Sequence, residues 1–170
     1  MIYIGIDPGK SGFTSMAFPS GRISCYETPT MPSGKREVYD PAAMRKVLLN
    51  AWDVSDPVVE DNMFCCIEKQ QPFPQQGGVS NYSTGFGYGL WLGLLAGLKI
   101  PYVAVSPREW KKALLGGTLK DKAASVILAG QLFPKIDLKR TARCKGPSHD
   151  KAESLLLMEF GKSWKSFKVE

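Results

Sequence analysis

Acidic side chains occur at three places in this chain where their neighbours are apolar. Asp7 directly follows the first apolar run, and Glu68 ends another. Asp150 and Glu153 are spaced three residues apart at the start of a predicted helix, so they project from the same side. Ionised carboxylates in a half-buried site are costly unless a cation neutralises them. Oxygen ligands without a soft ligand nearby favour Mg²⁺ or Mn²⁺, so the pattern predicts a hard divalent-metal site.

Each of these acids also has a purely structural explanation. An aspartate before Pro-Gly is common in turns, as at Asp7, and an acid in a first helical turn interacts favourably with the helix dipole, as at Asp150. The metal-site prediction therefore rests on the three locations occurring together. It also requires the strands that end at Asp7 and Glu68 to pair in parallel with aligned ends.

The elements that must position these acids follow from periodicity and turn residues. Three early strands followed by alternating helices and strands predict one α/β domain over residues 1–170, with a mixed sheet flanked by helices. The expected strands are 2–6, 13–18, 23–26, 63–68 and 102–105, the expected helices are 41–52, 82–99, 106–112, 121–133 and 148–161, and the expected loops include 28–40, 70–83 and 135–147.

The charge of the chain is unevenly distributed. The 170 residues carry 22 basic and 16 acidic side chains, a net charge of +6. Residues 1–85 carry seven basic and nine acidic side chains, whereas residues 86–170 carry fifteen and seven. This asymmetry favours a polyanionic partner, with nucleic acid ahead of a membrane surface, over the alternative of a basic solvated face.

Cysteine and hydropathy patterns exclude several other classes. The four cysteines show no CxxC spacing and His149 is the only histidine, which argues against structural zinc and suits a reducing compartment. No secretory leader pattern is recognisable at the start. The apolar stretch 86–98 is shorter than the roughly 20 residues that a membrane span needs. We therefore expect an intracellular protein without a membrane partner.

Three ordered motifs resemble those of the RuvC-type Holliday junction resolvases, within the RNase H-like nuclease superfamily. They are Ile4-Gly5-Ile6-Asp7-Pro8-Gly9, Ile67-Glu68-Lys69-Gln70 and Asp150-Lys151-Ala152-Glu153. The segments 72–75 and 85–91 look more like the phage and plastid branches than the main bacterial one. The resemblance runs from Met1 to about Gly161 and implies an RNase H-like fold.

The resemblance also implies an activity and its residues. The acidic quartet would be Asp7, Glu68, Asp150 and Glu153, holding two Mg²⁺ ions, with Mn²⁺ able to substitute. The last position is Asp in many bacterial members. The implied reaction is phosphodiester hydrolysis that leaves a 5′-phosphate and a 3′-hydroxyl. Further catalytic candidates are Lys111 and Lys122 at the scissile phosphate, and His149 beside the quartet.

DNA binding and assembly follow from the same resemblance. Symmetric cutting of a four-way junction implies a two-fold homodimer, whose interface we expect at 82–98, although that segment also fits an ordinary core helix. The glycines of this segment recur every four residues.

The expected DNA-binding residues are Lys69, Gln70, Gln71, Phe73, Arg108, Lys111, Lys112, Lys120 and Lys122.

The motifs leave three other functions open. These are a less selective branched-DNA or flap nuclease, a junction-binding module without nuclease activity, and an RNA-directed RNase H-like enzyme. The intact quartet argues against a pure binding module, since clustered acids repel DNA. The expected compartment is a bacterial cytoplasm, with a host or phage gene, or an organelle matrix.

Overall fold

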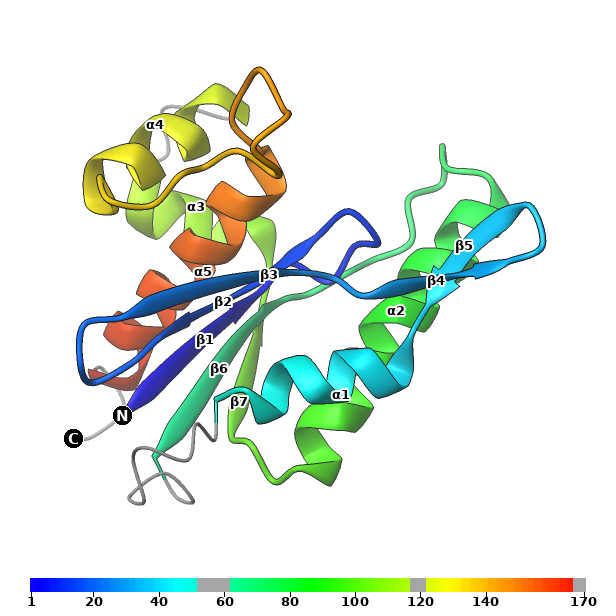
Figure 1. Cartoon of the computed structure of the whole chain (residues 1–170), viewed down its shortest axis with the longest axis horizontal. Helices are drawn as coiled ribbons and strands as arrows, with labels where there is room; N and C mark the ends of the chain where they lie inside the picture. Colours follow the sequence, from blue (N-terminus) through cyan, green and yellow to red (C-terminus); the bar gives the residue numbers. More distant parts are fainter. Residues whose placement is uncertain (52–61, 117–121, 167–170) are drawn as a thin grey trace.

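A five-stranded mixed sheet forms the centre of the protein, in a computed structural model that describes residues 1–51, 62–116 and 122–166 (Figure 1). The strand order is β3-β2-β1-β6-β7. Strand β1 pairs antiparallel with β2 and parallel with β6. The strands are β1 (Ile2–Ile6), β2 (Phe13–Ala17), β3 (Ile23–Glu27), β6 (Met63–Glu68) and β7 (Tyr102–Val105). The predicted α/β architecture with a mixed sheet is therefore confirmed.

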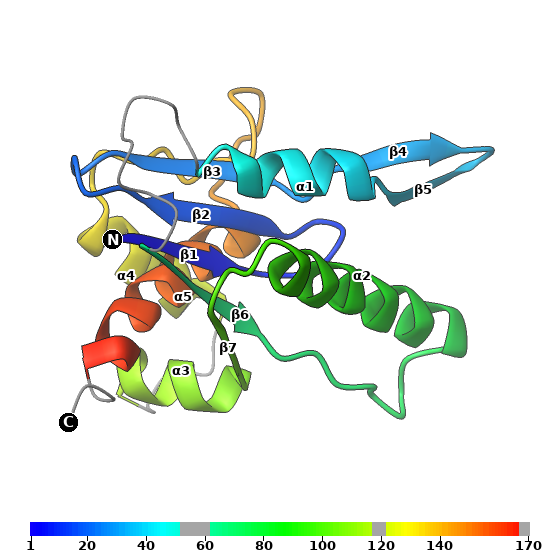
Figure 2. The ribbon, with the colours of Figure 1, turned by 90° about the horizontal axis from the view of Figure 1, so that it is seen from below.

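Helices cover both faces of this sheet, as Figure 2 shows. On one face, α1 (Pro41–Leu49) and α2 (Gly78–Gly97) pack on Ile2, Ile4 and Ile6 of β1. The other face packs against α3 (Pro107–Leu115), α4 (Lys122–Leu132) and α5 (His149–Ser166). Alternation along β1 thus places Gly5, and Asp7 just beyond the strand, on the α5 side.

Helix α5 lies directly on β1 because residue 5 has no side chain. A Cβ at Gly5 would stand 2.2 Å from the Ser154 carbonyl oxygen and 2.3 Å from the Met158 nitrogen, both of them backbone atoms of α5. A buried contact of 2.7 Å between the Ser15 and Ser154 hydroxyls ties the helix to β2 as well. This close approach brings the first turn of α5 to the end of β1.

The expected loop over residues 28–40 is wrong. The structure forms a hairpin there from β4 (Thr30–Ser33) and β5 (Arg36–Tyr39). Gly34 has a φ of 61° in the two-residue turn, which suits a tight hairpin. Pro32 is tolerated because this two-stranded ribbon has no central strand. Figures 1 and 2 show the hairpin reaching beyond the main sheet alongside α2.

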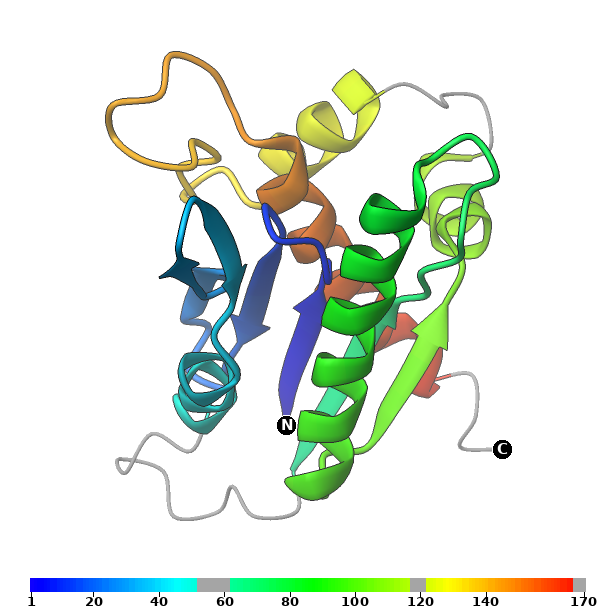
Figure 3. The ribbon, with the colours of Figure 1, turned by 90° about the vertical axis from the view of Figure 1, so that its right-hand side faces the viewer.

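Several helix boundaries also differ from the prediction. Helix α2 begins at Gly78, so the preceding loop is shorter than expected, and α5 continues to Ser166. Only Gly87, Trp91 and Leu95 of α2 are fully buried, and no described element covers its outer side (Figure 3). Helix α1 ends at Leu49, and the expected end at Trp52 lies outside the described residues. Among the described residues, no helix is both long and apolar enough to cross a membrane.

Candidate functional site

Asp7 and Glu68 stand side by side at the carboxyl end of the sheet. Strands β1 and β6 are parallel, with Ile6 opposite Ile67, so the next residue of each strand is an acid. The Asp7 N–H donates to the Phe13 carbonyl at 3.0 Å, which fixes the backbone where β1 turns into β2. The aligned strand ends that the metal-site prediction required are confirmed.

The Glu68 carboxylate is held by two neighbours. Trp110 Nε1–H donates to Glu68 Oε2 at 2.8 Å, and Gln70 Nε2 donates to Oε1 at 3.3 Å. The indole is fully buried on α3, whose capping box at Ser106 fixes the start of that helix. Gln70, predicted to contact DNA, thus contacts the Glu68 carboxylate, and its DNA contact stays a prediction.

The Glu153 carboxylate contacts a lysine and a histidine. Lys111 Nζ lies 2.5 Å from Glu153 Oε1, and His149 Nε2 lies 3.1 Å from the same oxygen. The Ser125 hydroxyl donates to that oxygen at 3.4 Å. Glu153 is only 7% exposed, so Lys111 is needed to compensate its charge. The structure therefore places both Lys111 and His149 beside the acidic cluster, as predicted.

Asp150, one turn earlier on α5, pairs with an arginine from the segment before that helix. Arg140 Nη2 lies 3.2 Å from Asp150 Oδ2. On the other oxygen, Oδ1, His149 Nδ1 stands 3.8 Å away. Asp150 is partly exposed.

Burial and like charges raise the pKa of Asp7 and of Glu68 and so favour the neutral forms of these two acids. Burial raises the pKa of Asp7 well above its usual range, and the nearby Glu68 carboxylate raises it further. Asp150 and Glu153 act on the pKa of Asp7 in the same direction. Burial also raises the pKa of Glu68, although the Trp110 hydrogen bond opposes that shift. All four predicted carboxylates are therefore electrostatic neighbours.

The donor set matches a hard divalent cation in kind. As the side chains stand, no three carboxylate, imidazole or thiol groups in the described parts of the chain enclose a common metal position. Lys111 and Arg140 instead neutralise Glu153 and Asp150. His149 Nε2 is buried and lies 3.1 Å from Glu153 Oε1, although no contact of this nitrogen among the described residues has hydrogen-bond geometry. Four carboxylates and one imidazole nitrogen fit an ion such as Mg²⁺ or Mn²⁺.

Four further basic candidates lie on or next to α3 and α4. Arg108 and Lys112 are exposed on α3, and within the described residues no ion pair joins either of them to a carboxylate. Lys122 begins α4, but its side chain is not among the described ones. Lys120 lies outside the described residues. Among the basic candidates whose side chains are described, Lys111 pairs with a carboxylate of the cluster, and Arg108 and Lys112 do not.

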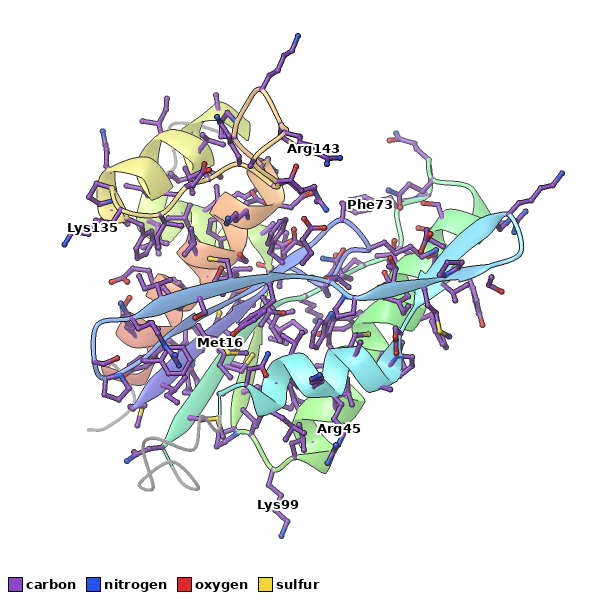
Figure 4. The ribbon with its side chains drawn as sticks, viewed as in Figure 1. Met16, Arg45, Phe73, Lys99, Lys135 and Arg143 are labelled. Atoms are coloured by element: carbon purple, nitrogen blue, oxygen red, sulfur yellow. The ribbon has the colours of Figure 1, made fainter. Side chains whose placement is uncertain are left out.

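The loop between β6 and α2 presents Phe73 to solvent. Lys69 and Gln71 are exposed on the same loop, and Phe73 is 57% exposed. Asn81 on α2 accepts from the Phe73 N–H at 3.1 Å and donates to the carbonyls of Phe73 and Gln76, each at 3.0 Å. Figures 3 and 4 show this loop and the Arg143 segment at the end towards which β1 runs.

Three residues near the cluster were not predicted. Trp110 holds Glu68, and Arg140 holds Asp150. The Tyr39 ring lies against Gly87 of α2, with its hydroxyl 3.5 Å from the Pro8 carbonyl, and Asp7 contributes to a raised Tyr39 pKa after burial. Of these three residues, only Arg140 lies in a segment that the sequence marked as unusual, because residues 135–147 are rich in basic side chains.

Comparison with known proteins confirms the predicted resemblance. No protein-family model matches the chain. A curated protein of Chlamydomonas reinhardtii, "Holliday junction resolvase MOC1, chloroplastic", is 33% identical over 91 residues, which are 54% of this chain. The match covers 10% of that relative, so the chain spans only a small part of its length.

Two solved structures share the fold over nearly the whole chain. "Thermus thermophilus RuvC structure" has a TM-score of 0.56 at 18% sequence identity. The alignment covers 98% of this chain and 96% of the RuvC chain. "T. thermophilus RuvC in complex with Holliday junction substrate" has a TM-score of 0.58 at 13% sequence identity. That alignment covers 99% of this chain and 97% of the RuvC chain. The predicted RNase H-like fold is therefore confirmed.

Proposed function

We propose, from this likeness to RuvC-type resolvases, that the chain is a Mg²⁺-dependent endonuclease that resolves Holliday junctions and leaves 5′-phosphate and 3′-hydroxyl ends. The observation that carries the proposal is the convergence of four carboxylates from β1, β6 and α5, with Lys111 among them. The name of the curated relative and the junction substrate of one structural neighbour support the choice of DNA. A module that only bound junctions would gain nothing from acids that repel DNA.

The four carboxylates divide the proposed metal binding between them. Asp7 lies at the centre, since the other three acids all act on its pKa, and it would contribute to two ions. Glu68 would complete one site, and Asp150 with Glu153 the other. Bound Mg²⁺ lowers the pKa of a coordinated water and offsets charge on the phosphate. His149 stands close enough to Glu153 to assist the second site.

The protein's own side chains orient these ligands. Trp110 and Gln70 each hold one Glu68 oxygen, so that carboxylate keeps one orientation. Lys111 lies on Glu153 and also acts on Glu68, with 32% of its side chain exposed. It can therefore turn from Glu153 to a phosphoryl oxygen and offset the charge that develops there. We propose the same role for Lys122.

DNA would approach over the loop end of the sheet. The exposed Phe73 ring is suited to stacking on an unpaired base, and Lys69 and Gln71 lie on the same loop. We propose Arg108, Lys112 and Lys120 as contacts to the DNA backbone further out. Such contacts release counterions, so binding is expected to weaken steeply as salt rises.

A homodimer through the outer side of α2 would supply two active sites. Cβ atoms built on Gly85, Gly89, Gly93 and Gly97 meet no atom within 4 Å, so a second helix can approach closely there. Tyr82 and Phe86, stacked at 6.0 Å, extend this open side and are 73% and 47% exposed. We propose that two copies pair across it.

A reducing compartment fits this chain, because all four cysteines are described and free. The curated relative is by its name a chloroplast protein, which supports an organelle matrix. A bacterial cytoplasm, with a host or phage gene, stays a prediction.

Cleavage of defined substrates tests the proposal. The protein with Mg²⁺ is offered a four-way junction, a flap, a linear duplex and an RNA–DNA hybrid. Paired, symmetric nicks confined to the junction are expected. Equal cutting of junction and flap would favour the less selective branched-DNA nuclease, and cutting of the hybrid would favour an RNase H-like enzyme.

Asp7→Asn keeps the shape of the side chain but removes its negative charge from the acidic cluster. Junction cleavage should fall by at least about a thousandfold, because both proposed ion sites lose a ligand. Glu159→Gln is the matched control, since Glu159 lies on α5, is partly exposed and, among the described residues, forms its ion pair with Lys162 at 2.6 Å. Wild-type cleavage by Asp7→Asn would refute the proposal.

A further inference from the structure

The Arg140 side chain contacts four separate segments of the chain around the acidic cluster. Its Nη1 lies 3.1 Å from Glu27 Oε2, and its Nη2 lies 3.2 Å from Asp150 Oδ2. The same Nη2 donates to the Ser11 carbonyl, and the guanidinium carbon lies 5.0 Å from the centre of the Phe13 ring. One side chain thus contacts the end of β3, the turn after β1, the start of β2 and the first turn of α5.

These contacts join the two acidic segments of the site. Ser11 belongs to the turn that begins with Asp7, and Asp150 belongs to α5, so Arg140 spans the gap between them. Arg140 also helps to hold a basic segment, residues 135–147, together with the hydrogen bonds from the Ser148 N–H to the Leu138 carbonyl and from Lys151 Nζ to the Lys139 carbonyl. Beyond the bridge between Lys139 and Pro147, this segment carries little regular structure. A planar group with five donors can serve several acceptors at once, which lysine cannot.

We infer that Arg140 is a positioning residue that holds the Asp150 carboxylate against the Asp7 turn and docks the basic segment on the active site. The inference rests on the proposed function for its metal-binding consequence. Arg140 contacts Asp150 Oδ2, whereas the contact of Oδ1 is the longer one of 3.8 Å with His149 Nδ1, so Oδ1 is the oxygen that we assign to a cation. Hydrogen-bond partners of ligating carboxylates orient them, and removing such partners commonly weakens metal affinity by about 10–100-fold.

Mn²⁺ binding in the absence of DNA measures this effect separately from cleavage. Calorimetric titration of the wild type, Arg140→Ala and Arg140→Lys is expected to show a Kd about 10–100-fold higher for the alanine variant. The lysine variant should fall between, since it can keep one ion pair. Arg143→Ala is the matched control, because Arg143 lies exposed on the same segment, and its Kd should equal that of the wild type.

Hydrogen exchange supplies a readout that needs no metal. In Arg140→Ala the backbone amides of residues 137–146 should exchange faster, while those of β1 and β6 keep wild-type protection and show that the fold is intact. Wild-type exchange in that segment, or an unchanged or tighter Kd for Mn²⁺, would overturn the inference. Failure of the wild type to bind Mn²⁺ would instead overturn the proposed function, and the exchange data would still decide whether Arg140 docks the segment.

Discussion

At the scale of single residues, the fold holds four acids together against their repulsion. The raised pKa values of Asp7 and Glu68 mean that the folded chain binds protons more tightly than the unfolded chain does. The stability from this effect is complete below the ordinary pKa, 3.8 for Asp7, and is lost as the pH rises through the folded value. The metal-free protein therefore carries a stability cost at neutral pH.

Asp7→Asn should remove part of that cost. Without divalent metal, the variant is expected to melt at a higher temperature than the wild type near pH 7.5, and the difference should shrink towards pH 4. For a chain of this length each kcal/mol regained corresponds to about 2–4 °C in Tm. Thermal denaturation in EDTA at both pH values measures it.

Two comparisons make this result specific to the acidic cluster. Glu159→Gln removes a partly exposed carboxylate of α5 that is already paired with Lys162, and it should leave the pH dependence of Tm unchanged. Mg²⁺ should raise the Tm of the wild type more than that of Asp7→Asn, because only the wild type keeps the complete donor set. A metal-free Asp7→Asn protein that melts below the wild type near pH 7.5 would contradict the repulsion argument.

The sequence allowed the acids to be predicted, but not the residues that hold them. Asp7 and Glu68 were found because each ends an apolar run, and aligned parallel strands then bring them together. Trp110 and Arg140 reach partners 42 and 10 residues away, and Arg140 also reaches Glu27, 113 residues away. Such contacts depend on how helices pack on the sheet, and no local pattern encodes them.

At the scale of elements, the main sheet and most helices were predictable, while the β4–β5 hairpin was not. Residues 28–40 contain Pro29, Pro32 and Gly34, which indicate a loop when taken singly. In the structure this stretch forms an isolated ribbon whose last residue, Tyr39, packs on Gly87. The α2 boundary was missed for a related reason, since Gly77 caps the helix without a side-chain hydrogen bond.

Asn81 offers a prediction about the loop between β6 and α2. Its amide makes three hydrogen bonds that hold the loop backbone around Phe73. Asn81→Ala should therefore weaken junction binding by about tenfold, since each net hydrogen bond contributes about 0.5–1.5 kcal/mol. The Tm should change little, because the loop is exposed. Binding is measured with Ca²⁺ in place of Mg²⁺ to prevent cleavage.

Asn81→Asp separates the contributions of the loop contacts. It keeps the acceptor for the Phe73 N–H and loses both donations, so an intermediate loss is expected. Phe73→Leu in the same assay shows whether the aromatic ring matters. If Asn81→Ala binds the junction like the wild type while Phe73→Leu does not, loop rigidity plays no part.

At the scale of the whole molecule, the open side of α2 is unusual because it exposes large apolar residues to solvent. Only three of its residues are fully buried, and Val79, Tyr82 and Phe86 are large and exposed. Exposed apolar patches are typical of interaction surfaces, and the proposed two-fold pair would bury the same stripe on both copies. The overall net charge of +6 says nothing about this surface, since α2 carries no charged residue.

Gly89→Phe tests the dimer directly. The new ring would stand where the present Cβ position is open, so the single chain should fold normally while a second helix can no longer approach. Sedimentation at micromolar concentration should show a dimer for the wild type and a monomer for the variant. Gly146→Phe, at another open glycine away from α2, should stay dimeric. Because symmetric resolution needs two coupled sites, Gly89→Phe should also nick junctions on one strand without the paired second cut. A wild-type chain that sediments only as a monomer would rule out the α2 interface, and any paired cutting would then need two copies assembled by the DNA itself.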